Sequence, residues 1–180
     1  MTSSSTSPST RDRLLPWIGS LESRGAALTD DLRRPVTTLA GALAAVHDRD
    51  ADRLLATMTD DVLIRIWGWS TGGQWSYRGD EARAATAAWL ATIGAGAVGV
   101  RVDIDRFFPG DGFLGFDGTW SRLTSGAGLA ESTSRFDPGA EYLVSRRFAF
   151  FGTFTRTGIS VVDLYWGIHP QIGLSDRSPR

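Results

Sequence analysis

Arg147 is the only charged side chain on one face of a predicted β-hairpin. Two apolar segments, residues 141–154 and 159–167, have the length of strands and flank a turn at residues 155–158, a pattern typical of a hairpin. With Phe154 paired to Ile159, side chains alternate between the faces with period two. The face of Arg147 then also carries Ala149, Phe151, Val162, Leu164 and Trp166. A single charge among apolar side chains is typical of a ligand cavity.

The second face of this hairpin is broad and aromatic. It carries Arg146, Phe148, Phe150, Val161, Asp163 and Tyr165. An apolar face of this breadth is what a subunit contact needs. The hairpin therefore suggests both a ligand cavity and an interface between chains.

The composition excludes several kinds of site. The chain has 180 residues, 42% of them hydrophobic, no cysteine and a net charge of −1. One domain with one core is expected, and neither nucleic acid nor a membrane is an expected partner. No thiolate is available, and two distant histidines, His47 and His169, do not make a zinc site. We expect no cofactor and no metal, no catalytic role for either histidine, and a cytoplasmic location because no signal peptide is present.

Helices and strands must position these side chains. Residues 1–10 are polar and expected to be disordered, and apolar spacing predicts a short docking helix over residues 12–24. A longer helix carries a stripe from Val36 to Val46, a short one follows at residues 50–58, and a third begins at residues 79–81. Strands are predicted at residues 62–69, 75–77, 98–108, 113–123 and in the hairpin arms.

Two connections bear on a site. The turn at residues 109–112 pairs Phe108 with Phe113, which places Asp117 opposite Ile104. The segment of residues 124–140 is rich in Gly, Ser and Thr and long for a strand connection, so it is either a mobile lid or a disordered insertion.

Three local sequences carry a resemblance to a known superfamily. These are RDADRLLATMTDDV at residues 49–62, YRGDEARAATAAWL at residues 77–90 and TGISVVDLYWG at residues 157–167. They resemble landmarks of the nuclear transport factor 2-like superfamily, which includes SnoaL-like polyketide cyclases, ketosteroid isomerases, limonene epoxide hydrolases and scytalone dehydratases. The resemblance covers residues 31–167 and specifies a fold better than an activity.

The resemblance implies an α+β fold. A cone-shaped, strongly curved antiparallel sheet would pack against N-terminal helices, as in a cystatin-like roll. The expected boundaries are a disordered tail with a docking helix at residues 1–28, the nuclear transport factor 2-like domain at residues 29–168, and a C-terminal tail at residues 169–180. Members of this superfamily hold an apolar pocket inside the cone, and many are dimers through the convex side of the sheet.

Aligned catalytic positions of the superfamily differ in this chain. The ketosteroid isomerase set falls on Ala42, Ile66 and Arg147, and the limonene epoxide hydrolase set is lost as well. The same alignment directs Asp117 and Arg147 inward as the only charges of the cavity face. A charge in an apolar cavity is costly unless it is paired, so the two should approach each other or a polar ligand group. The alternative is a structural ion pair that ties two strands together.

These expectations give a function hypothesis. The chain would be a cofactor-independent enzyme that acts on an apolar, ring-containing substrate by proton transfer, as an isomerase, cyclase, dehydratase or epoxide-opening enzyme. Asp117 would be the general base or acid, and Arg147 would stabilise charge on a substrate oxygen. The substrate would contact Ile64, Ile66, Thr119, Leu164, Trp166 and Phe136, the last from the lid. The alternative is a non-catalytic binding protein for a small hydrophobic ligand.

The resemblance also favours a homodimer through the outer sheet face. The residues expected to form the contact are Phe148, Phe150, Val161 and Tyr165, with Asp163 at the rim or in the interface. An isologous contact would bring each apolar patch onto its own copy.

Overall fold

One curved sheet organises the molecule, which we describe from a computed structural model covering residues 29–68, 73–94, 97–130, 136–167 and 169–174. Its strands are β1 (Met58–Trp67), β2 (Gln74–Arg78), β3 (Ala97–Gly110), β4 (Phe113–Ser125), β5 (Glu141–Phe154), β6 (Ile159–Trp166) and β7 (Gln171–Leu174). The strand order is β2-β1-β6-β5-β4-β3, with β7 added beside β5. The tail and docking helix expected within residues 1–28 lie outside the described residues.

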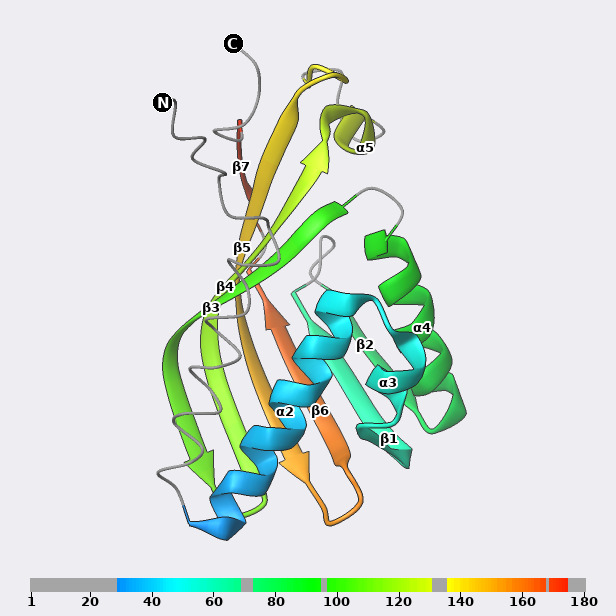
Figure 1. Cartoon of the computed structure of the whole chain (residues 1–180), viewed down its shortest axis with the longest axis vertical. Coiled ribbons are helices and arrows are strands. Elements are labelled where there is room, and N and C mark those ends of the chain that lie inside the picture. Colours follow the sequence, from blue (N-terminus) through cyan, green and yellow to red (C-terminus); the bar gives the residue numbers. More distant parts are fainter. Residues whose placement is uncertain (1–28, 69–72, 95–96, 131–135, 168, 175–180) are drawn as a thin grey trace, which may run out of the picture.

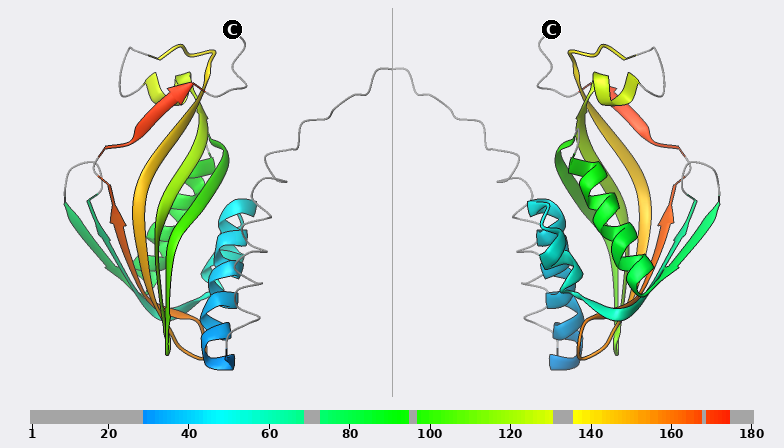
Figure 2. Two further views of the ribbon diagram at one scale, coloured as in Figure 1. Left: turned by 90° about the vertical axis from the view of Figure 1, so that its left-hand side faces the viewer. Right: turned by 90° about the vertical axis from the view of Figure 1, so that its right-hand side faces the viewer.

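The sheet is mixed, whereas a fully antiparallel sheet was expected. β1 runs parallel to β6, and the other pairs are antiparallel. Parallel neighbours need a long crossover, and the chain between β1 and β6 supplies one because it contains α4 and the long strands β3, β4 and β5. The predicted fold class, α+β with helices packed against a strongly curved sheet, is confirmed (Figure 2).

Helices cover the concave side of this sheet. They are α2 (Asp30–Asp48), α3 (Ala51–Leu55) and α4 (Asp80–Gly94), while the short helix α5 (Gly126–Ala130) lies at the far end of the long strands (Figure 1). α2 ends at Arg49, which has a left-handed backbone (φ 59°) and donates its N–H to the carbonyls of Ala45 and Val46. Asp50 then caps α3 by accepting a hydrogen bond from the N–H of Arg53 at 2.9 Å. This tight corner holds the C-terminal end of α2 close to α3.

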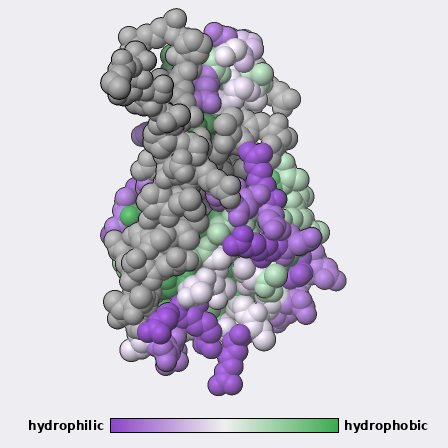
Figure 3. Space-filling model, viewed as in Figure 1, coloured by the Kyte–Doolittle hydropathy of each residue, from purple (hydrophilic) through white to green (hydrophobic). Residues whose placement is uncertain are grey.

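The burial pattern of α2 explains its orientation. Val36, Leu39 and Ala45 are at most 2% exposed, because their helical spacing places them on the side that faces the sheet. Hydrophilic side chains instead gather over the C-terminal end of α2 and over α3 (Figure 3). Among the described helices, none is both long enough and apolar enough to span a membrane.

A β-bulge in each long hairpin changes the predicted register. Phe154 pairs with Ile159 as expected, but Thr153 pairs with Val161, so Ser160 is an extra residue and Phe148 lies opposite Trp166. Because side chains alternate, a one-residue slip moves every β5 side chain to the other face. Phe148 and Phe150, predicted on the outer face, are therefore buried on the concave side.

The β3–β4 hairpin is displaced by a shorter turn and by its own bulge. Gly112 has a positive φ of 62°, and Gly110 pairs with Phe113, so the turn is tighter than the predicted pairing of Phe108 with Phe113 requires. Asp117 consequently pairs with Arg106, and Asp105 is the extra residue of the bulge. The predicted partner of Asp117, Ile104, lies opposite Gly118 instead.

A second apolar cluster occupies the far end of β4 and β5. Its buried residues are Leu129, Ala140, Tyr142 and Val144, with Phe136 packed against them. β7 pairs with β5 at this end, although residues 169–180 were expected to be a tail. The strand is exposed along its length, which explains why its sequence gave no core signal.

Candidate functional site

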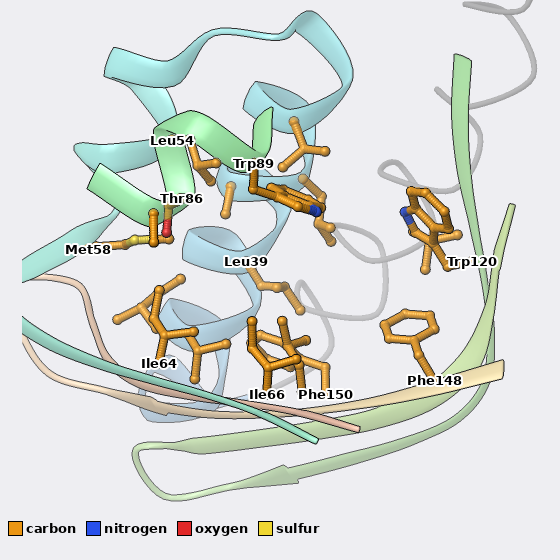
Figure 4. Close-up of a pocket in the computed structure, with 18 of the residues that line it drawn as sticks. Leu39, Leu54, Met58, Ile64, Ile66, Thr86, Trp89, Trp120, Phe148 and Phe150 are labelled. Atoms are coloured by element: carbon orange, nitrogen blue, oxygen red, sulfur yellow. The ribbon is translucent and has the colours of Figure 1, made fainter. Parts of the chain in front are cut away.

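The concave face of the sheet and the three N-terminal helices enclose a partly open cavity of about 520 Å³ (Figure 4). This volume is typical of a site for one small organic molecule. α2, α3 and α4 contribute Leu39, Ala42, Leu43, Val46, His47, Leu54, Ala85, Thr86 and Trp89. The sheet contributes Met58, Ile64, Ile66, Trp75, Tyr77, Val102, Phe116, Trp120, Phe148, Phe150, Ile159, Val162, Leu164 and Trp166.

Aromatic rings build one wall of this cavity. Phe116 stacks on Phe150 with ring centroids 5.0 Å apart and meets Phe148 edge-on at 5.5 Å. Trp166 stacks on Phe148 at 5.5 Å and meets Trp120 edge-on at 5.6 Å. Such pairs are favourable beyond their buried area, and they fix the orientation of each ring. The wall is therefore preorganised to receive a flat apolar ligand.

The polar groups of the cavity are few and mostly donors. Four of the described lining residues are tryptophans, Trp75, Trp89, Trp120 and Trp166, and an indole N–H can only donate. In Figure 4 the indole nitrogens of Trp89 and Trp120 are turned toward each other across the cavity. The Thr86 hydroxyl donates to the carbonyl of Ala82 at 2.8 Å, so it can only accept a hydrogen bond from a ligand. Among the described lining residues, none is an aspartate, glutamate, lysine or arginine.

His47 is the functional candidate that the sequence prediction missed. It is half-buried in the last turn of α2 and lines the cavity. Its position continues the helical stripe of Leu39 and Leu43, eight and four residues earlier, and this spacing could have identified it. Among the described lining residues, the imidazole of His47 and the phenol of Tyr77 can exchange a proton in a mechanism.

Asp117 and Arg147 do not line the cavity, and their predicted placement there is wrong. The bulge between β5 and β6 directs Arg147 to the convex face of the sheet. Because β4 pairs with β5 without a bulge, Asp117, opposite Ala149, lies on the same face. Arg106 donates from Nε to Asp117 Oδ2 at 2.8 Å, while Arg147 pairs with Asp105 and donates to the Thr119 hydroxyl at 3.2 Å. Each forms a surface ion pair with a residue of β3, so neither can act on a ligand in this cavity.

The charge of Asp117 is set by this convex-face pairing. The hydrogen bond from Arg106 is the main cause that lowers the pKa of Asp117, burial opposes it, and the charges of Arg106 and Arg147 lower it further. Its second oxygen, Oδ1, is buried and accepts no hydrogen bond from the protein. Asp117 is therefore an ionised carboxylate that ties β3 to β4.

Asp163 also lies on the convex face, as predicted. Arg65 of β1 donates to both of its oxygens, at 2.6 and 2.7 Å, in a bidentate pair that spans two strands. This hydrogen bonding is the main cause that raises the pKa of Arg65. A role for this pair at the rim of an interface stays a prediction.

The remaining predicted contacts divide between the two faces. Ile64, Ile66, Leu164 and Trp166 lie on the cavity wall, as their strand phase predicts, although substrate binding by them stays a prediction. Thr119 lies on the convex face beside Arg147, because the β4 register differs.

Phe136, the residue predicted to close over the substrate, lies in the second apolar cluster. Its ring meets Tyr142 edge-on at 5.0 Å, and it is not among the residues that line the cavity. Part of the expected lid forms the end of β4 and the helix α5. Residues 131–135 lie outside the described residues, so gating by the whole segment stays a prediction.

Comparison with known proteins identifies the fold. No protein-family model and no curated protein sequence matches the chain. Two solved structures provisionally assigned as polyketide cyclases are similar. The one from Shewanella putrefaciens, SnoaL-like, has a TM-score of 0.61 at 11% identity, with 92% of each chain covered. The one from Xanthomonas campestris has a TM-score of 0.57 at 18% identity, covering 77% of this chain and 94% of that one. The chain has the nuclear transport factor 2-like fold.

A third structure with this fold was solved with a small molecule. TerC, co-crystallised with polyporic acid, has a TM-score of 0.51 at 18% identity, covering 73% of this chain and 89% of TerC. Sequence identities this low show a shared fold but not a shared activity. The function of the cavity inside the nuclear transport factor 2-like cone therefore has to be inferred from the residues that line it.

Proposed function

We propose that this protein binds an apolar, ring-containing small molecule inside the cone. The observation that carries the proposal is the cavity itself, about 520 Å³ in volume and walled by stacked and edge-on aromatic rings. Burial of apolar ligand surface contributes about 25 cal/mol per Å², and the fixed rings lose little conformational freedom on binding. The co-crystallisation of TerC, a protein of the same fold, with polyporic acid supports a small-molecule ligand.

A second candidate function is catalysis by proton transfer on that ligand. It is favoured by His47, the imidazole that reaches the cavity from the end of α2. Imidazole is the commonest general acid or base in enzymes, and the Tyr77 hydroxyl could donate to a substrate oxygen. An isomerase, cyclase, dehydratase or epoxide-opening reaction would need such a pair and no cofactor. Similar structures assigned as polyketide cyclases support this class of chemistry.

The binding proposal is tested with a neutral fluorescent probe, N-phenylnaphthylamine, and a matched pair of variants on α4. Ala85 lines the cavity, and Ala84, its neighbour in sequence, is exposed. We expect Ala85→Phe to weaken probe binding at least about tenfold because the added ring occupies ligand space. Ala84→Phe should bind as the wild type does. Equal binding by both variants, or no binding by the wild type, would contradict the proposal.

We also propose that the protein is a homodimer through the convex face of the sheet. Phe148 and Phe150 of the predicted patch face the cavity, so they are not available for this contact. Instead, an aromatic row crosses four strands, from Trp67 through Tyr165 and Phe151 to Phe113. Tyr165 is 43% and Phe113 38% exposed. An apolar surface of this kind is commonly buried against another chain.

A further inference from the structure

Two arginines extend the cavity wall along the concave face of the sheet. β4 and β5 pair without a bulge over their whole length, with Trp120 opposite Arg146 and Arg122 opposite Val144. Side chains two residues apart on a strand share a face. Arg122 therefore lies on the face of Trp120, and Arg146 on the face of Phe148. Each arginine is thus the next residue on this face beyond a residue that lines the cavity, Trp120 on β4 and Phe148 on β5.

These arginines occupy a half-buried position between two apolar clusters. The cavity wall lies on one side, and Tyr142 and Val144 of the second cluster lie on the other. The guanidinium carbon of Arg122 lies 5.9 Å from the ring centroid of Trp120, so its charge stands over a lining residue. The Arg122 Nε is buried and has no hydrogen-bond partner in the protein.

The electrostatics of the position favour an anion. Burial lowers the pKa of Arg122, and burial followed by the charge of Arg122 lowers the pKa of Arg146. The two positive charges therefore repel each other where water is partly excluded. A buried donor without a partner is unfavourable, and an arriving anion would satisfy the donor and relieve the repulsion.

We propose that Arg122 and Arg146 bind an anionic group of the ligand whose rings fill the cavity. The ligand class is then a flat apolar ring system with a carboxylate, sulfonate or acidic phenolate at one end. Guanidinium groups present planar forks of donors that match such oxygens. The rings would contact the aromatic wall, and the anionic end would lie past Trp120. This inference rests on the proposed function, because it names the ligand of the same cavity.

Two probes with one aromatic skeleton separate the inference from the proposed function. N-phenylnaphthylamine is neutral, and anilinonaphthalene sulfonate carries a sulfonate on the same rings. The variants are Arg122→Gln, Arg146→Gln and the matched control Arg78→Gln, in which an exposed arginine on the outer side of β2 is changed. Circular dichroism and thermal melting establish that each variant is folded. Arg122→Lys retains the charge and serves where the glutamine variant does not fold.

We expect the wild type to bind the sulfonate more tightly than the neutral probe. Each cavity-side Arg→Gln change should weaken sulfonate binding about tenfold to a hundredfold, the range for hydrogen bonds to a charged group. Binding of the neutral probe, and of both probes by Arg78→Gln, should stay within about a factor of two. Arg122→Lys should retain part of the sulfonate preference.

Three other outcomes would contradict the inference, and they differ in whether the proposed function survives. If the neutral probe binds and the sulfonate gains nothing from the arginines, the anion site is refuted and the cavity proposal stands. If Arg78→Gln weakens the sulfonate as much as Arg122→Gln does, binding reflects general surface charge and the inference fails. If neither probe binds the wild type, both proposals fail together.

Discussion

At the scale of single residues, the cavity offers His47 as its candidate for moving a proton. The imidazole lies in the last turn of α2 and lines the cavity. A protonated imidazole can act as a general acid toward a substrate oxygen, and the neutral imidazole that results can accept a proton as a general base. The Asp–Arg pair expected to do this work instead stabilises the opposite face of the sheet.

The catalytic candidate gives the first prediction. A ligand that purifies with the protein is identified by native mass spectrometry, and its conversion is measured with wild type and with His47→Gln. We expect turnover to fall about 10²- to 10⁴-fold, the usual contribution of a general acid or base, while binding of N-phenylnaphthylamine changes less than about threefold. Unchanged turnover would exclude His47 as the acid or base. A ligand that binds but is not converted would support the binding function and contradict catalysis.

The Asp117–Arg106 pair gives a prediction on pH. The pKa of Asp117 is lowered below its ordinary value of 3.8, so the folded state favours the charged form. Its stabilising contribution is therefore fully present above pH 3.8 and is lost as the pH falls through the lower, folded-state pKa. We expect Asp117→Asn to be less stable than wild type at about pH 7, and the difference to shrink at about pH 3. Urea unfolding at both pH values measures it.

The matched control for this carboxylate is Asp111→Asn. Asp111 is exposed in the tight turn between β3 and β4, and no ion pair is found for it in the described part of the chain. Its substitution should leave the pH dependence of stability as in wild type. A destabilisation by Asp117→Asn that is equal at both pH values would show that lost packing, not lost charge, is responsible.

At the scale of elements, the sequence predicted the order of helices and strands well because that order follows from periodicity. The stripe of α2, the acidic start of α4 and the apolar runs of β5 and β6 each produce a local pattern. The phases of β1 and β6 were also predicted correctly, which placed Ile64, Ile66 and Leu164 on the cavity wall. β7 was missed because it is short and exposed.

The phases of β4 and β5 could not be predicted in the same way. Both depend on a single extra residue, Ser160 in β6, because β4 pairs with β5 without a bulge, and serine is not a residue type that marks a bulge. One such residue exchanges the two faces of the neighbouring strand. The result moved Arg147 outward and Phe148 inward, which is why the predicted catalytic pair and the predicted interface were both misplaced.

Gly118 makes the bulge of β3 possible and gives a prediction at this scale. A Cβ at Gly118 would lie 2.0 Å from the carbonyl oxygen of Asp103, so any side chain must push β3 away from β4. We expect Gly118→Ala to lower the free energy of unfolding by about 1–3 kcal/mol, as overpacking does. The control is Gly173→Ala in β7, where a Cβ meets no atom within 4 Å. Urea unfolding that ranks the two variants equally would contradict this role of Gly118.

At the scale of the whole molecule, the sheet separates two kinds of surface. Its concave face is apolar and aromatic and ends in Arg122 and Arg146, which suits a ligand with one charged end. Its convex face combines the aromatic row with ion pairs such as Arg65–Asp163, in which each charge is already neutralised within one chain. The convex face can therefore pack against the convex face of a second copy, because charges that are paired within one chain do not repel the same charges of an identical neighbour.

The dimer prediction follows from this convex face. Tyr165 lies at the middle of the aromatic row, stacked on Trp67 at 4.5 Å and in edge contact with Phe151 at 5.8 Å. We expect wild type to sediment as a dimer at micromolar concentration. Tyr165→Glu should weaken association at least about a hundredfold, because a two-fold contact would bury two carboxylates against apolar surface. The control is Leu174→Glu, which changes a residue 65% exposed on β7, outside the row. A wild type that sediments as a monomer, or a dimer that tolerates Tyr165→Glu but not Leu174→Glu, would refute an interface through the aromatic row.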